Sequence, residues 1–271
     1  MAAMSAPRRD TRGIVDAREL FSHVHFRRRE PAPGLRTQVA FYWLIDWDLP
    51  EPYTSHVVPH PSVNLVFQHH ESSGEAAFAE VAGIGLGLFT QKLEGRGRVC
   101  AVKFRPGGFR PFAPGRPVSE WTGRRLLAHE ILAVPAPVAA VLDPAQEDAR
   151  VAALDAYLLA LAPEPDPQAE RAMALVERVR TDRTMRRVDE LARTEGLSAR
   201  SLQRLFATYV GVGPKWVILR YRIHEALERA ESDPEVDWAE LAADLGYSDQ
   251  AHLTRDFTST IGAPPTALVT R

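Results

Sequence analysis

The 271-residue sequence lacks the features of a secreted, disulfide-stabilised or membrane protein. Its single cysteine, Cys100, cannot form an internal disulfide bond, which fits a reducing cytoplasm. No apolar run reaches the roughly 18 residues that a membrane span needs. The first twelve residues carry no apolar core of a secretion signal, so we expect residues 1–13 to form a disordered tail. These absences predict a cytoplasmic protein that contacts no membrane.

Common signatures of catalysis are also missing. The sequence has no glycine loop for a nucleotide, no paired histidines on a helix and no nucleophile elbow, so we expect no enzyme activity, catalytic residue, cofactor or metal site. Cys100 lies in the apolar run "RVCAVKF", where cysteine behaves as a small hydrophobic residue. Six histidines are interpreted as scattered loop and strand-end positions: His23, His25, His56, His60, His69 and His70. The alternative is a cupin-like metalloenzyme domain in which His56 and His60 face one barrel interior.

The chain lacks an overall positive charge, since its formal net charge is −2. The distribution of charge is nevertheless uneven. Residues 171–222 hold 12 Lys and Arg against 5 Asp and Glu, whereas residues 223–271 hold 3 against 10. A basic segment of net +7 therefore precedes an acidic segment of net −7. Such a basic segment can attract phosphates even though the whole chain does not.

The N-terminal half combines strand and helix patterns. β-branched and aromatic residues are concentrated at 37–47, 62–70 and 97–104, which predicts strands there. The stretch 118–132 could be a helix, and the apolar spacing at 147–161 indicates another. We therefore expect an α+β protein whose N-terminal domain is β-rich.

Three alternate prolines in "APEPDPQAE" mark the boundary between two domains, because they favour an extended linker. We assign residues 14–162 to a regulatory domain, 163–168 to the linker and 169–271 to an all-α DNA-binding domain. The helices predicted after the linker are 169–180, 185–195 with Thr184 as its N-cap, 199–210, 214–232, 237–245 and 249–261.

Two stretches after the linker share one plan, at 188–206 and 238–257. Each has a short helix, then glycine, an apolar residue and serine, and then a second helix, which is a helix-turn-helix pattern. Gly196 and Gly246 supply the φ > 0 conformation that such a turn commonly needs. The predicted fold is thus a β-rich domain followed by two helix-turn-helix units joined by a long helix.

The second helix of each unit presents polar side chains away from its apolar stripe. In the first unit these are Arg200, Ser201, Gln203 and Arg204, and in the second they are Gln250, His252, Thr254 and Arg255. Arginine can donate two hydrogen bonds to guanine, and glutamine can pair with adenine. The alternative is that both faces are merely solvated, but the duplication favours double-stranded DNA as the partner.

This part of the sequence, about residues 170–270, resembles the tandem helix-turn-helix domain of AraC/XylS-type transcription regulators. The most specific stretch is "LGYSDQAHLTRDFTSTIGAPP", at 245–265. The resemblance implies two recognition helices in successive major-groove segments, read by Arg200, Gln203 and Arg204 and by Gln250, Ala251, His252, Thr254 and Arg255. Ala251 departs from the pattern because it offers only an apolar contact.

The N-terminal stretches 41–50, 59–67 and 102–112 resemble a domain attached to this unit in some actinobacterial-type regulators, and by analogy its fold is expected to be cupin-like. Its most distinctive motif, "FRPGGFRPF", places Arg105 and Arg110 beside two glycines. They could form a loop that binds an anionic ligand or a turn held by arginine–carboxylate pairs. A small-molecule effector, a homodimer contact and a contact of the acidic segment with RNA polymerase all remain open, as does a monomeric state.

Overall fold

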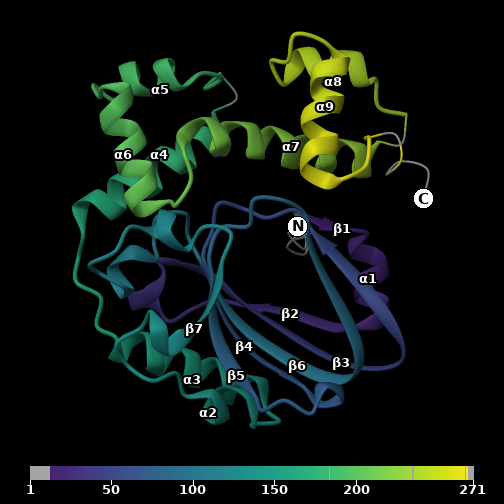
Figure 1. Ribbon diagram of the computed structural model, residues 1–271, viewed down its shortest axis with the longest axis vertical. Helices are drawn as coiled ribbons and strands as arrows, with labels where there is room; N and C mark the ends of the chain where they lie inside the picture. Colours follow the sequence, from purple (N-terminus) through teal and green to yellow (C-terminus); the bar gives the residue numbers. More distant parts are fainter. Residues whose placement is uncertain (1–12, 183, 234, 266, 268–271) are drawn as a thin grey trace, which may run out of the picture.

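The computed structural model describes residues 13–182, 184–233, 235–265 and 267. The predicted tail at 1–13 therefore falls outside the described residues except at Gly13. Within the described chain, the β-rich N-terminal region and the helical C-terminal region are both confirmed (Figure 1).

The N-terminal region is built on one antiparallel sheet with strand order β1-β3-β6-β4-β5-β7, in which β2 also pairs with β3. Its strands are β1 (Ile14–Val15), β2 (His25–Arg29), β3 (Val39–Val57), β4 (Asn64–His70), β5 (Phe78–Ala82), β6 (Phe89–Phe104) and β7 (Arg125–Leu127). The long pair β3 and β6 shifts register between Leu49 and Tyr53. Two prolines lie in this interval, and proline cannot donate to a strand ladder.

The two faces of the sheet have different neighbours because side chains alternate along a strand. One face, which includes Tyr42 and Phe67, packs in a core with α2 (Val138–Leu142) and α3 (Glu147–Ala160). The Tyr42 hydroxyl donates to the Asp155 carboxylate of α3 at 2.6 Å. The other face looks toward α1 (Ala17–His23) and lines a cavity.

The prediction of a helix at 118–132 was wrong. This segment consists of a 3-10 turn at Val118–Trp121, strand β7 and a second 3-10 turn at Ala128–Glu130. Gly123 has φ +73°, which interrupts any helix, and β7 completes the edge of β5. Tertiary pairing therefore overrides the local helical pattern.

The C-terminal region contains α4 (Pro167–Thr181), α5 (Val188–Thr194), α6 (Ala199–Tyr209), α7 (Pro214–Ser232), α8 (Trp238–Asp244) and α9 (Gln250–Ile261). Figure 1 shows α7 running between the pairs α5–α6 and α8–α9. Thr184 is not an N-cap, because α5 starts at Val188. There the Arg187 backbone N–H donates to the Glu190 carboxylate, while Thr184 binds Asp182.

The helical region packs directly on the N-terminal sheet domain. One hydrophobic core continues from the helix-covered sheet face into the first helix-turn-helix unit, and a second core joins Val58 to the second unit. Between the first unit and the sheet domain, the Thr122 hydroxyl donates to the Gly211 carbonyl at 2.7 Å. Both helix-turn-helix units therefore have fixed contacts with the N-terminal domain.

Candidate nucleic-acid interface and interdomain cavity

The first helix-turn-helix unit consists of α5, a turn at Gly196 and α6. Gly196 has φ +63°, as expected for this turn. Leu202 and Phe206 are completely buried, so they fix α6 against the core. The Ser198 hydroxyl caps α6 by accepting a hydrogen bond from the Ser201 backbone N–H at 3.1 Å. These local signals set the direction of α6.

The face of α6 that points away from this core is exposed at Arg200, Gln203 and Arg204. These positions follow helical spacing, so their side chains project on one side. Ser201 is half-buried, and its hydroxyl lies 2.9 Å from the capping hydroxyl of Ser198. Within the described chain, neither Arg200 nor Arg204 forms an ion pair, which leaves both guanidinium groups available to DNA.

The second unit repeats this construction with α8, Gly246 and α9. Gly246 has φ +76°, and Leu253 and Phe257 are completely buried. The Asp249 carboxylate caps α9 by accepting from the His252 backbone N–H at 2.7 Å, and this bond holds the pKa of Asp249 below its ordinary value. Helix α9 ends at Gly262, whose φ is +82°.

The outer side of α9 offers fewer available groups than that of α6. Gln250, Ala251 and Arg255 are exposed, whereas His252 and Thr254 are half-buried. The His252 ring lies edge-on to Tyr247, with its Nδ1 3.2 Å from the Ser248 hydroxyl. The predicted base-reading residues of α9 thus lie along one helix, but the His252 imidazole already contacts Tyr247 and Ser248.

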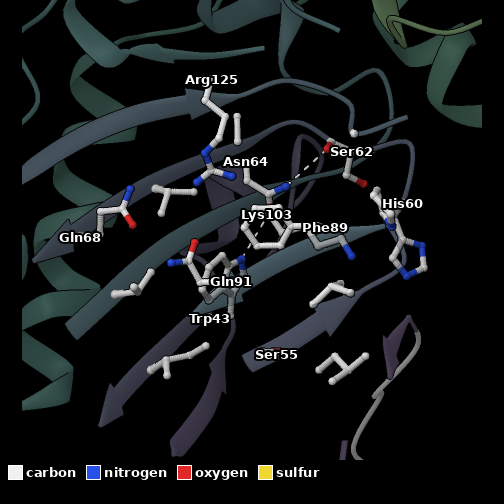
Figure 2. Close-up of a pocket in the computed structure, with 18 of the residues that line it drawn as sticks. Trp43, Ser55, His60, Ser62, Asn64, Gln68, Phe89, Gln91, Lys103 and Arg125 are labelled. Atoms are coloured by element: carbon white, nitrogen blue, oxygen red, sulfur yellow. Dashed lines mark hydrogen bonds between the residues drawn. The ribbon is translucent and has the colours of Figure 1, made fainter. Parts of the chain in front are cut away.

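A cavity of about 630 Å³ lies against the sheet face that α2 and α3 leave uncovered. Residues at alternate positions in parts of β2, β3, β4 and β6 line it. They include Trp43, Asn64, Phe89, Gln91 and Lys103, which Figure 2 shows grouped around the space. The Trp43 indole N–H donates to the Asn64 side-chain oxygen at 3.4 Å. The sequence analysis missed this cavity, because the cavity forms only when distant strands pair. One signal was present: apolar side chains occur at both odd and even positions of "FYWLIDW", which indicates that both faces of this strand are covered.

Two segments of the cavity wall also contact α7. His60 lines the cavity and stacks on the buried His224 of α7, with ring centroids 3.9 Å apart. Leu86 also lines it, and its carbonyl accepts a hydrogen bond from Arg220 Nη2 at 2.7 Å. Arg220 is only 4% exposed, and this burial lowers its pKa to about 10. The cavity wall therefore touches α7, the helix that joins the two helix-turn-helix units.

The predicted ligand-binding arginines Arg105 and Arg110 do not line this cavity. Arg105 is exposed and its Nε donates to the Arg36 carbonyl at 3.0 Å, while the Arg110 guanidinium lies 6.0 Å from the Tyr209 ring centroid. Gly107, with φ +94°, packs against α4 near Met173. Among the described residues, neither arginine pairs with a carboxylate, and Arg105 bonds a backbone carbonyl at this turn.

The remaining polar groups give no sign of a metal centre. Among the described residues, no group of three or more His, Cys, Asp or Glu side chains is arranged to hold a metal ion. Cys100 is completely buried, and burial raises the pKa of its thiol. In the part of the chain that the structure covers, no helix is long and apolar enough to cross a membrane.

Two family models match the chain. A domain of unknown function, DUF6597, matches residues 27–127, and a helix-turn-helix domain matches residues 191–271. The first match covers β3, β4, β5, β6, β7 and most of β2, and the second covers α6, α7, α8, α9 and most of α5. No curated protein matches the chain.

Several solved structures resemble parts or most of the chain. The C-terminal domain of AraT, a response regulator from Geobacillus stearothermophilus, is 22% identical with a TM-score of 0.33, over 36% of this chain and 85% of that one. ToxT from Vibrio cholerae is 9% identical with a TM-score of 0.43, over 84% of this chain and 97% of that one. A ToxT structure with bound unsaturated fatty acid is 12% identical with a TM-score of 0.38, over 91% of this chain and 93% of that one. Because these identities and TM-scores are low, we assign neither a fold nor a ligand to this chain from these structures.

Proposed function

We propose that this DNA-binding transcriptional regulator, whose C-terminal domain is an AraC-type helix-turn-helix domain, reads double-stranded DNA with α6 and α9 in adjacent major-groove segments. The observation that carries the proposal is the pair of capped helices that expose arginine and glutamine on their outer faces and are joined by α7. Successive major-groove segments on one face of DNA lie about 34 Å apart.

We infer that α6 supplies most of the grip and α9 mainly refines the choice of sequence. Helix α6 belongs to the +7 segment and α9 to the −7 segment, so phosphates are attracted mainly to the first unit. Phosphate contacts position a protein on DNA, whereas base contacts specify the sequence. The exposed guanidinium groups of Arg200 and Arg204 can make either contact, while α9 offers Gln250 and Arg255.

Selection of bound DNA from a random pool tests the proposal and identifies the site. We expect a site with two conserved blocks about one helical turn apart. Footprinting titrations on that site should show that Arg204→Ala weakens binding about tenfold or more, and more than Arg255→Ala does. Lys92→Ala, an exposed change on β6, is the matched control and should have no effect. The reverse order of the two arginine variants would contradict the division between α6 and α9, and no enrichment of DNA would contradict DNA reading itself.

We also infer that the N-terminal domain binds a small-molecule effector in the cavity and passes its presence to α7. Support comes from the two wall segments that contact α7, through His60 on His224 and through the Leu86 carbonyl to Arg220. A ligand that moves either segment changes the contacts of the helix between the two units. Selection with and without cell extract tests this. Equal DNA affinity in both would favour an N-terminal domain that only mediates dimer contacts.

A further inference from the structure

The two helix-turn-helix units contact each other directly, in addition to sharing helix α7. Arg186 lies just before α5 of the first unit, and its Nη2 donates to the backbone carbonyl of Asp244 at 2.8 Å. Asp244 is the last residue of α8 in the second unit. The last carbonyls of a helix have no partner within the helix and lie at the negative end of its dipole, so a guanidinium group is well suited to bind one.

The backbone of Arg186 is held to the first unit. Its N–H donates to the Glu190 carboxylate of α5 at 3.2 Å, and the same carboxylate accepts from the N–H of Arg187 at 3.1 Å. Arg186 therefore belongs to the first unit by its backbone and reaches the second unit with its side chain.

The turn of the second unit leaves room for the Arg186 side chain. A Cβ atom at Gly246 would lie 2.7 Å from the Arg186 Cδ atom and 2.9 Å from its Nε atom. Gly196 holds the equivalent position in the first unit, and a Cβ there would meet nothing within 4 Å. Both glycines have positive φ, as the turn requires, but the close approach of another side chain is a property of Gly246.

A second arginine, Arg222 of α7, joins the same contact. Its Nη2 donates to the Arg186 carbonyl at 2.9 Å, and its guanidinium lies 5.5 Å from the ring centroid of Tyr247. Tyr247 follows Gly246 in the turn and is buried in the core of the second unit. The segment before α5, helix α7 and the second turn thus meet at one point.

We propose that Arg186 is a positioning residue that fixes the orientation of α9 relative to α6, and thereby the one spacing between DNA blocks that the protein accepts. This deepens the proposed function and rests on it. Each unit packs on α7 through a separate core, and the bond from Arg186 to Asp244 adds a third connection. Neither unit can rotate about α7 without breaking that bond, and two recognition helices arranged before binding favour the one site that matches them.

A distance measurement without DNA tests the orientation. Spin labels are placed on α6 and α9 by Ala199→Cys and Ser259→Cys, both at exposed positions, and Cys100 can stay because it is completely buried. We expect a narrow distribution of distances in the chain with these labels alone, a broader one with Arg186→Ala, and a narrow one again with Arg186→Lys, because lysine can also donate to a carbonyl. Arg187→Ala is the matched control and should leave the distribution narrow. It removes an exposed arginine one position away that, within the described residues, has no hydrogen bond or ion pair to the second unit.

Footprinting titrations on DNA sites of altered spacing test the consequence for binding. One base pair inserted between the two blocks of the selected site turns the second block by about 35° and moves it by about 3.4 Å. We expect the wild-type chain and Arg186→Lys to bind the lengthened site about tenfold or more weakly than the selected site, and Arg186→Ala to lose less than about threefold between the two sites. Arg187→Ala should keep the tenfold difference.

Three results would overturn the proposal. They are a broad distribution of distances without any change at Arg186, a distribution that stays narrow in Arg186→Ala, and equal weakening of both DNA sites by Arg186→Ala, which would mark Arg186 as a phosphate contact. If Arg186→Ala does not fold, the wild-type chain and Arg186→Lys still decide, because both must show the narrow distribution and the tenfold difference. A chain that selects no DNA loses the proposed function, while the distances still judge the contact. A chain that selects a two-block site but keeps its spacing preference in Arg186→Ala loses this inference alone.

Discussion

Arg220 offers a direct test of how the two domains are held together. It lies on α7, only 4% exposed, with its guanidinium 4.3 Å from the Trp216 ring centroid and one hydrogen bond to the Leu86 carbonyl. Its Nη1 atom is buried without a hydrogen-bond partner among the described residues. We consider Arg220→Met, which keeps an apolar side chain of similar reach and removes the charge.

Opposing contributions to the free energy of unfolding nearly cancel at this position. Burial lowers the Arg220 pKa from 12.5 to about 10, which corresponds to a cost of about 3 kcal/mol for keeping the charge. The charge-assisted hydrogen bond stabilises by about 1.5–3 kcal/mol, and the contact with Trp216 adds up to about 2 kcal/mol. Arg220→Met should therefore change the free energy of unfolding by no more than about 2 kcal/mol in either direction.

The same substitution should loosen the contact between the domains. Without the hydrogen bond to Leu86, backbone amides at 84–89 and in the first half of α7 should exchange faster with deuterium. Urea unfolding gives the stability, hydrogen exchange gives the local opening, and Lys215→Met, an exposed change on α7, is the control. A loss of more than about 3 kcal/mol, or unchanged exchange at 84–89, would refute the reasoning.

Two further changes test the sheet domain and the first turn. Burial raises the pKa of the Asp46 carboxyl, but hydrogen bonds from Arg27 and Arg98 and the charge of Arg150 outweigh it and leave the pKa lowered. Asp46→Asn should therefore lower the free energy of unfolding in urea by about 3 kcal/mol at neutral pH. Because the folded pKa is depressed, the difference in stability between wild type and variant should shrink as the pH falls below the ordinary Asp value of about 3.9 toward the folded pKa. A pH-independent difference would contradict this. Gly196→Ala should cost about 1–2 kcal/mol, because φ is +63° there. Gly213→Ala, where φ is −72° and space is open, should be nearly neutral.

The helical half could be predicted closely because its signals are local. Helix α7 spans the predicted residues 214–232, and α9 begins after its capping Asp249 and ends at Gly262. The two boundaries of α9 depend on the Asp249 side chain and on the positive φ of Gly262, whereas α7 begins at a first-turn proline, Pro214. The cap of α5 was missed because it comes from a residue inside the helix: the Glu190 carboxylate accepts from the Arg187 backbone N–H. The sequence analysis considered only Thr184, which precedes the helix.

The N-terminal half was predicted less well because its elements depend on partners far along the chain. Strand β3 continues through Pro50 and Pro52 to Val57, supported by β6, although prolines usually end a strand. The stretch taken as a helix at 118–132 contains β7, which exists only because β5 offers a free edge. The cavity depends on the register of four strands, so no single stretch of sequence could indicate it.

Under the proposed effector function, helix α7 would connect the cavity to both α6 and α9. Its buried residues contact the sheet domain through Arg220 and His224, while Ile223 and Leu227 belong to the core of the second unit. Its first half packs in the core of the first unit through Val217. A shift of α7 relative to the cavity wall therefore changes the positions of α6 and α9 together, because each packs on a core that α7 shares. The structure thus favours joint control of both helix-turn-helix units over separate control of either.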